Sequence, residues 1–129
     1  LLTKCLYEKK GAAKTFKIID SGMHLLIRPA LYEGYHEINP VKEPTGETEV
    51  VDVVGPICET GDFFCQDREV PSFQPGDVIA MMSAGAYGFT MASTYNTHPL
   101  PAEILVDGSE SRVVRKRQTL KELISPEEI

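Results

Sequence analysis

The chain has 129 residues, of which 42% are hydrophobic and 25% are charged, so it is long enough to bury a core as one globular domain. Its formal net charge of −6 argues against nucleic acid and against anionic membrane surfaces as partners. No apolar stretch approaches the length of a membrane span, so we expect no membrane partner.

The first half of the chain alternates short apolar segments with turn residues. Residues 1–8 and 14–20 flank the turn "KKGA" and are predicted to be two strands. Residues 21–32 predict a short helix or a turn-rich crossover, because Pro29 limits any helix there. Residues 35–41 predict a further strand, which is followed by the loop "KEPTGE".

The second half continues this pattern. The nearly continuous apolar run at residues 48–56 is typical of a buried strand. After a polar loop, a Pro-Gly-Asp turn precedes a predicted strand at residues 78–82. The segment "AYGFTMASTYN" predicts a short helix or a glycine-rich loop, and residues 102–108 and 111–119 predict a hairpin across "DGSE".

The C-terminal segment carries the one basic run and one helix signal. The run "RVVRKR", residues 112–117, indicates a solvated strand face rather than a phosphate-binding patch. Thr119 and Glu122 have the spacing of a capping box at a helix start. Many short strands, frequent turn signals and little helix together predict a mostly β protein, either a barrel or a sandwich.

Cysteines and histidines are few and scattered. An odd number of cysteines without CxxC spacing indicates neither a zinc site nor a complete disulfide framework, and it fits a reducing cytoplasm: Cys5, Cys58 and Cys65. The histidines lack ligand spacing, so we expect structural or solvent-side roles and no metal site: His24, His36 and His98.

The segment "GPICETGDFF", residues 55–64, places a cysteine in a tight, polar turn. Inert cysteines usually lie in apolar surroundings, whereas Cys58 is followed by an acid, a hydroxyl, a glycine and another acid. This pattern is more typical of an exposed, working thiol. The local residues leave two alternatives open, a buried structural role for Cys58 and a plain surface position for Glu59.

Three blocks together resemble a known family. "SGMHLLIRPALYEGYHEI", "VVGPICETGDFF" and "GAYGFTMASTYN" occur in the order found in the C-terminal domain of the diaminopimelate decarboxylases. The resemblance extends over about residues 1–108. It implies a mostly β, Greek-key-like β-barrel domain with short helices, of the kind found in fold-type III decarboxylases that use pyridoxal 5′-phosphate. The implied reaction converts meso-2,6-diaminopimelate to L-lysine and CO2.

The resemblance also implies what lies outside this sequence. Residues 1–129 would form a single β-barrel domain, and the N-terminal (β/α)8 barrel with the cofactor lysine and the phosphate loop would precede it. A start at "LLTKCLYEKKG" without methionine indicates a piece of a longer protein or a processed chain. The family usually has an Asn-Asp pair where this chain has His24-Leu25, a departure outside the matched chemistry.

Five residues take roles from the resemblance. Cys58 matches the proton donor that acts after decarboxylation, and Glu59 matches the partner of the far ammonium group of the substrate. Arg28 and Tyr32, in "RPALY", match the pair that binds the far carboxylate, for which a guanidinium offers a two-pronged donor. Tyr87, in "GAYG", would lie beside the cofactor phosphate and the substrate.

The resemblance further implies a homodimer, in which the Cys58 loop of one subunit completes the site of the other. Cys65 receives no role and is expected to be a small strand or turn residue. Two alternatives remain: a related decarboxylase of another diamino acid or polyamine precursor, and a non-catalytic β-barrel binding module.

Overall fold

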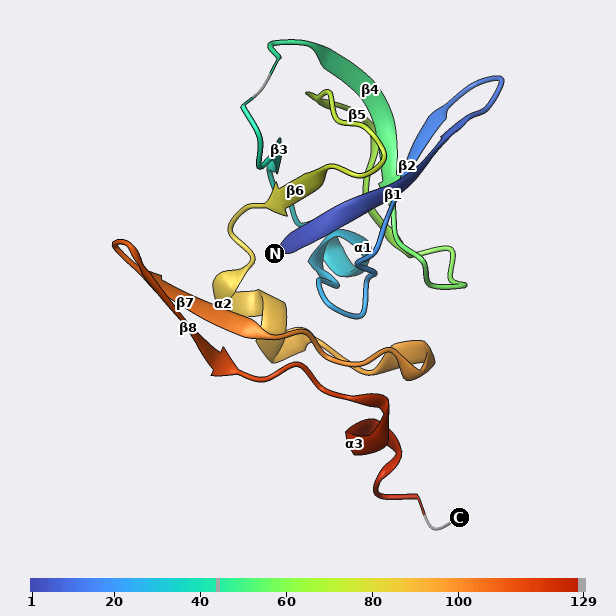
Figure 1. The fold of residues 1–129 in the computed structure, drawn as a ribbon. Coiled ribbons are helices and arrows are strands. Elements are labelled where there is room, and N and C mark those ends of the chain that lie inside the picture. Colours follow the sequence, from blue (N-terminus) through green and yellow to red (C-terminus); the bar gives the residue numbers. More distant parts are fainter. Residues whose placement is uncertain (44, 128–129) are drawn as a thin grey trace.

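The structure is a computed structural model that describes residues 1–43 and 45–127. Within these residues, a six-stranded sheet with the order β3-β6-β1-β2-β4-β5 curls until its two edge strands contact each other (Figure 1). This nearly closed barrel confirms the mostly β prediction. Its strands are β1 (Leu2–Lys10), β2 (Thr15–Ile19), β3 (Ile38–Pro40), β4 (Thr48–Val54), β5 (Phe63–Pro71) and β6 (Val78–Met81).

The strands of the six-stranded sheet are paired in antiparallel fashion, with one parallel exception. Strands β1 and β2 form the predicted hairpin, closed by a hydrogen bond from the Gly11 N–H to the Lys14 carbonyl at 2.8 Å. Strand β2 pairs with β4 in parallel, so the chain between Ile19 and Thr48 must cross from one end of the barrel to the other. That crossover carries α1 and β3.

Strand β5 was not predicted from the sequence, which indicated a loop there. The strand is difficult to predict because it contains the polar run "QDRE". These residues lie at a bulge, where the pairing of β5 with β4 is irregular. Asp67 adopts a positive φ of 47° at this point, and its N–H donates to the Asp52 carboxylate at 2.6 Å. The strand predicted at residues 35–41 is also wrong in extent, because β3 covers only three of them.

The helices are short, as predicted. Helix α1 (Arg28–Tyr32) has Pro29 in its first turn, where a missing N–H is tolerated, and ends at Glu33 in the left-handed conformation. The segment "AYGFTMASTYN" lies in three helical turns, α2 (Gly85–Gly88), η1 (Phe89–Met91) and η2 (Tyr95–Thr97). Across residues 1–43 and 45–127, every helix is too short to cross a membrane.

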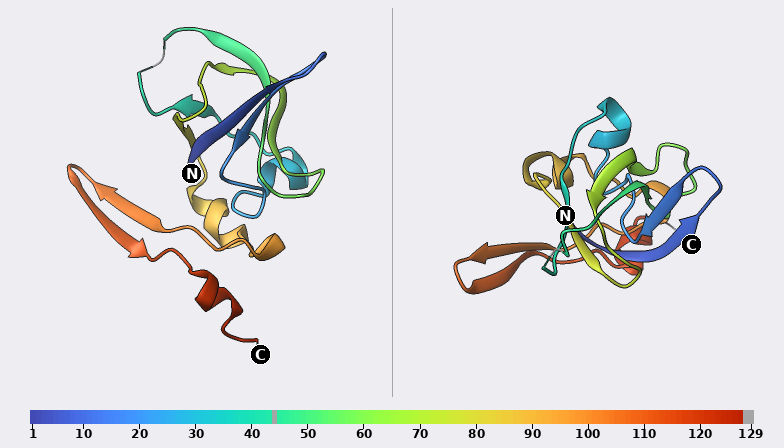
Figure 2. Two further views of the ribbon diagram at one scale, coloured as in Figure 1. Left: turned by 45° about the vertical axis from the view of Figure 1, so that its right-hand side comes forward. Right: turned by 90° about the horizontal axis from the view of Figure 1, so that it is seen from above.

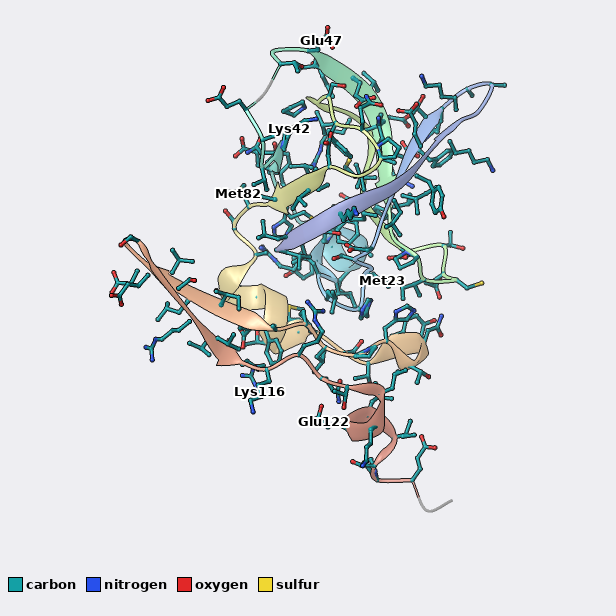
Figure 3. All side chains as sticks on the ribbon, in the orientation of Figure 1. Met23, Lys42, Glu47, Met82, Lys116 and Glu122 are labelled. Atoms are coloured by element: carbon teal, nitrogen blue, oxygen red, sulfur yellow. The ribbon has the colours of Figure 1, made fainter. Side chains whose placement is uncertain are left out.

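The C-terminal segment leaves the barrel. Figure 2 shows the predicted hairpin of β7 (Glu103–Asp107) and β8 (Glu110–Arg115) extending away from it. Every residue of β8 is exposed, as expected for the strand part of the basic run. Helix α3 (Leu120–Ile124) begins with the capping box predicted from Thr119 and Glu122, and both reciprocal hydrogen bonds are present. Lys116 and Glu122, labelled in Figure 3, mark this outlying segment.

The core fills the inside of the barrel. Every strand of the six-stranded sheet contributes at least one side chain that is nearly excluded from solvent, and Cys5 and Cys65 are among them. Cys65 was expected to be a small strand or turn residue, and it lies on β5 as a strand residue. The core residues are Cys5, Ile19, Leu26, Ile38, Val51, Val53, Phe64, Cys65, Val70, Phe73, Ile79 and Met81.

One lysine is buried in this core. The Lys17 side chain is 0% exposed; its ammonium group donates to the Phe73 carbonyl at 2.7 Å and forms ion pairs with Glu8 and with Glu49, the latter at 3.0 Å. Burial alone would lower the pKa of Lys17, but the hydrogen bonds to the two glutamates outweigh it and raise that pKa. Lys17 therefore stays charged and joins β1, β2 and β4.

A buried histidine lies at the end of the barrel near η2. His24 is 4% exposed, its Nδ1 has no hydrogen-bond partner among the described residues, and its ring lies 4.9 Å from that of His98. Burial lowers the pKa of His24 from 6.5 to about 4, and the neighbouring His98 lowers it in the same direction. The imidazole is therefore neutral in the folded chain near pH 7.

Lys17 generates a stability prediction. Lys17→Met removes the cation, takes the donor from the buried Phe73 carbonyl, and leaves Glu8 with only Lys10 and Glu49 with only the Phe73 N–H, which should cost about 3 kcal/mol in the free energy of unfolding. Chemical denaturation measures this loss. Lys42→Met is the matched control, since Lys42 pairs with Asp77 near the surface and should cost less than ~1 kcal/mol. Equal losses in the two variants would contradict the structural role of Lys17.

His24 generates a prediction about pH. Its folded-state pKa lies below the unfolded value, so the unfolded chain binds the proton more tightly. Its contribution to stability is complete above pH 6.5 and is lost as the pH falls towards 4, by up to about 3 kcal/mol. His24→Leu should flatten the stability profile across this window.

Denaturation midpoints measured from pH 4 to 7 test this expectation. Leu26→Ala is the control, because it removes a buried side chain without removing a titratable group. It should lower stability equally at every pH. A His24→Leu profile with the slope of the unsubstituted protein would show that another group causes the acid sensitivity.

Candidate functional site

The parallel pairing of β2 with β4 brings two functional segments to one end of the barrel. The chain leaves β2 into residues 20–27, which lead to Arg28, and it leaves β4 into residues 55–62, which contain Cys58. Both segments therefore start at the same end of the barrel, where the two parallel strands end. Figure 3 labels Met23 in the first of them, on the side of the barrel that faces η2.

The loop at residues 55–62 exposes its two candidate groups. Cys58 and Glu59 are both exposed, whereas Ile57 is buried beneath them. The loop is closed by hydrogen bonds from the Gly55 N–H to the Asp62 carbonyl at 3.0 Å and from the Asp62 N–H to the Glu59 carbonyl at 3.1 Å. The exposed thiol expected from the sequence is confirmed, and a buried structural role for Cys58 is excluded.

Asp62 carries a carboxylate that is buried under this loop. It accepts the Ile57 N–H at 2.5 Å and the Met23 N–H at 2.6 Å, so it joins the loop to the segment that leads to α1. Burial raises the pKa of Asp62, and the two backbone N–H groups and the nearby His98 oppose that rise. No role was predicted for Asp62 from the sequence, although it belongs to "CETGD".

Glu59 has a partner that the sequence analysis did not single out. The Tyr95 hydroxyl donates to Glu59 at 3.0 Å, and this hydrogen bond lowers the pKa of the Glu59 carboxyl. The same contact raises the pKa of the Tyr95 hydroxyl. Glu59 is therefore held as an anion in one orientation. Tyr95 lies within "GAYGFTMASTYN", the third of the blocks that resemble the decarboxylase family, and this position is the sequence feature from which its role could have been predicted.

Arg28, Tyr32 and Tyr87 form a second cluster. The Arg28 Nε donates to the Tyr32 hydroxyl at 2.8 Å, which confirms that these two residues share one side of the helix. The Arg28 Cζ lies 5.6 Å from the ring centre of Tyr32 and 5.8 Å from that of Tyr87. The structure therefore brings together three of the four residues that were expected to bind substrate or cofactor, while Glu59 lies apart, against Tyr95.

A cavity lies beside Glu59 and Tyr95. It measures about 270 Å³ and is lined by Met23, His24, Ile27, Glu59, Ser93 and Tyr95. Ile27 precedes Arg28 and Glu59 follows Cys58 in the chain. Among the described residues, hydrogen bonds and ring contacts direct Arg28 towards Tyr32 and Tyr87, and a hydrogen bond directs Glu59 towards Tyr95.

The arrangement offers acid–base and charge-recognition chemistry at an open surface. An exposed thiol can donate a proton, an oriented carboxylate can pair with a cation, and a guanidinium braced by a phenol can bind an anion. The described part of the chain contains no group of three or more His, Cys, Asp or Glu side chains that could hold a metal ion.

Comparisons with known proteins identify the family. The family described as "Pyridoxal-dependent decarboxylase, C-terminal sheet domain" matches residues 1–85. Diaminopimelate decarboxylase of Zymomonas mobilis subsp. mobilis is 46% identical over 128 residues, which cover 99% of this chain and 30% of that protein. The chain thus spans about a third of the length of the curated relatives it matches.

Solved structures agree with this match. Diaminopimelate decarboxylase from M. jannaschii, in complex with L-lysine, superposes with a TM-score of 0.93 and 37% identity, covering 100% of this chain and 30% of that one. The enzyme from Helicobacter pylori, also in complex with L-lysine, gives a TM-score of 0.88 and 43% identity, covering 98% and 31%. The chain belongs to the family of C-terminal sheet domains of pyridoxal-dependent decarboxylases.

Proposed function

We propose that this chain is the C-terminal domain of a diaminopimelate decarboxylase, which converts meso-2,6-diaminopimelate to L-lysine and CO2. The observation that carries the proposal is the exposed Cys58–Glu59 pair, which is fixed to the barrel through Asp62 and Tyr95. The similarity to L-lysine-bound relatives over nearly the whole chain supports it. The rest of the enzyme, with a (β/α)8 barrel and the cofactor lysine, would precede residue 1.

The family name implies pyridoxal 5′-phosphate, and the second cluster fits the rim of its site. Arg28 places a cation between two phenol rings, and the space beside Gly85 is open, so an anionic group could approach Tyr87. When bound, this cofactor delocalises the electron pair that the departing carboxylate leaves on the α-carbon. This domain would supply side chains that contact the substrate and the cofactor, and the covalent anchor would lie on the barrel.

Cys58 is proposed to donate the proton that replaces the lost carboxylate. Its Sγ would deliver the proton to the α-carbon that has lost its carboxylate, and this carbon becomes the CH2 group that bears the side-chain amine of L-lysine. A thiol is one of the side-chain groups that can act as a positioned general acid. The exposure of Cys58 at the loop tip allows this contact.

Glu59 is proposed to recognise the far ammonium of the substrate. The hydrogen bond from Tyr95 keeps the Glu59 carboxylate ionised and directs one oxygen, which leaves the group charged for a cationic partner. Arg28 would bind the far carboxylate, because its Nε is held by Tyr32 and the guanidinium plane is thereby fixed. Diaminopimelate presents both groups at its far end.

The two clusters support a shared site in a homodimer. Arg28 and Glu59 are directed to different neighbours, although one substrate end would need both. Two subunits related by a two-fold axis resolve this, since each could supply Cys58 and Glu59 to the site of the other.

Free cysteines in the described residues fit a cytoplasmic location for such an enzyme.

Two other functions are weighed against this one. Decarboxylases of other diamino acids share the fold, as a lysine/ornithine decarboxylase from Vibrio vulnificus complexed with cadaverine shows at 17% identity and a TM-score of 0.65, but that likeness concerns the fold alone. A non-catalytic binding module would have no need for an exposed thiol beside an oriented carboxylate. Activity on meso-diaminopimelate, measured with the full-length enzyme, separates the three.

The role of Cys58 can be tested in the full-length enzyme. Cys58→Ala should lower the turnover number by a factor of about 10² to 10⁴, which is the usual effect of losing a positioned acid, with less change in the Michaelis constant. Cys65→Ala is the matched control, because Cys65 is buried on β5 and should affect stability more than turnover. Equal losses of turnover would mean that neither thiol is the donor.

The shared site can be tested by complementation. One inactive enzyme carries Cys58→Ala, and a second lacks the cofactor lysine. Random exchange of subunits makes half of the dimers mixed, each with one intact site of two, so activity should return to about a quarter of that of the unsubstituted enzyme. Steady-state decarboxylation, measured after subunit exchange has been demonstrated, gives the result. No recovery would place Cys58 and Glu59 in the site of their own chain.

A further inference from the structure

A buried carboxylate lies directly beneath the exposed loop that carries Cys58 and Glu59. Asp62 is 4% exposed and takes part in four hydrogen bonds, two through its carboxylate and two through its main chain. The main-chain pair closes the loop at residues 55–62. The carboxylate pair ties the loop to Met23, five residues before Arg28, so one residue links both clusters of the site.

The chain is shaped to receive this carboxylate. A Cβ atom at Gly55 would lie 2.5 Å from both Asp62 carboxylate oxygens, and a Cβ at Gly22 would lie 3.1 Å from one of them. The distance at Gly55 is too short for a side chain, and a Cβ at Gly22 would also lie only 2.6 Å from the Ile57 Cγ1 atom. Two glycines, one in each segment, therefore let the main chains close around the Asp62 side chain.

The chemistry of the two bonds requires a carboxylate. Both partners of the side chain are backbone N–H donors, and an ionised carboxylate can accept from both at once. An asparagine of the same shape would turn its own NH2 towards one of them. Burial raises the pKa of Asp62, so keeping the charged form has a cost, which the two N–H groups offset.

Resting on the proposed function, we propose that Asp62 is the positioning residue of the site and fixes where the Cys58 thiol and the Glu59 carboxylate stand relative to the Arg28 cluster. Apart from Ile57, the loop has few buried side chains to orient it, because Pro56, Cys58, Glu59 and Thr60 are all exposed. Asp62 acts through the main chain and does not touch the substrate.

The test uses the full-length enzyme with Asp62→Asn. We expect the turnover number to fall about 10- to 100-fold and the Michaelis constant to rise, since misplacing a reacting group by about 1 Å can cost 10²-fold. Hydrogen exchange followed by mass spectrometry should show faster exchange in residues 21–24 and 55–62. Asp77→Asn is the control: Asp77 accepts the Gln74 N–H at 2.7 Å in a distant turn, and its loss should lower the melting temperature without these effects.

The outcomes separate this proposal from the proposed function. Turnover and exchange within twofold of the unsubstituted enzyme in a folded Asp62→Asn variant would overturn the proposal, as would lost turnover with unchanged exchange in the loop. If Cys58→Ala leaves turnover intact, the proposed function fails, and the exchange measurement still decides whether Asp62 holds the loop. If Asp62→Asn does not fold, Gly55→Ala decides, because it keeps the carboxylate but must displace it and should give the same kinetic losses.

Discussion

The parallel pairing of β2 with β4 is the constraint on which the site depends. In a sheet that is otherwise antiparallel, this one pairing sends the chain out of both strands at the same end of the barrel. The segment before Arg28 and the loop around Cys58 become neighbours for that reason alone. Asp62 then needs only two hydrogen bonds to fix one against the other, since the sheet has already brought their main chains together.

Two buried charges stabilise different parts of the molecule by different means. Lys17 lies among the barrel strands, where two glutamates balance its charge and the Phe73 carbonyl accepts a hydrogen bond from it, so removing it takes the cation from both carboxylates. Asp62 has no cationic partner within hydrogen-bonding distance among the described residues and relies on backbone N–H groups. The first arrangement joins strands. The second orients a loop, because a carboxylate held by main-chain donors fixes the loop in one position relative to the sheet.

Local sequence signals predicted much of the fold, and they failed where tertiary contacts decide. The capping box at Thr119, the proline in the first turn of α1 and the hairpin of β7 and β8 depend on residues close in sequence. Strand β5 was missed because its bulge and its pairing with β4 come from residues far apart in the chain. Asp62 and Tyr95 were missed for a related reason, since their partners lie 39 and 36 residues away.

The candidate residues themselves show why this domain offers only part of a site. Cys58, Glu59, Tyr32 and Tyr87 are all exposed, and the cavity beside Glu59 and Tyr95 opens to the surface. Charge recognition and proton transfer both gain strength when water is excluded, which these side chains cannot do alone. On the proposed function, the rest of the enzyme or a second subunit would supply the covering surface. A domain that fixes its functional groups through hydrogen bonds but leaves them exposed to solvent is suited to contribute to a site formed between subunits.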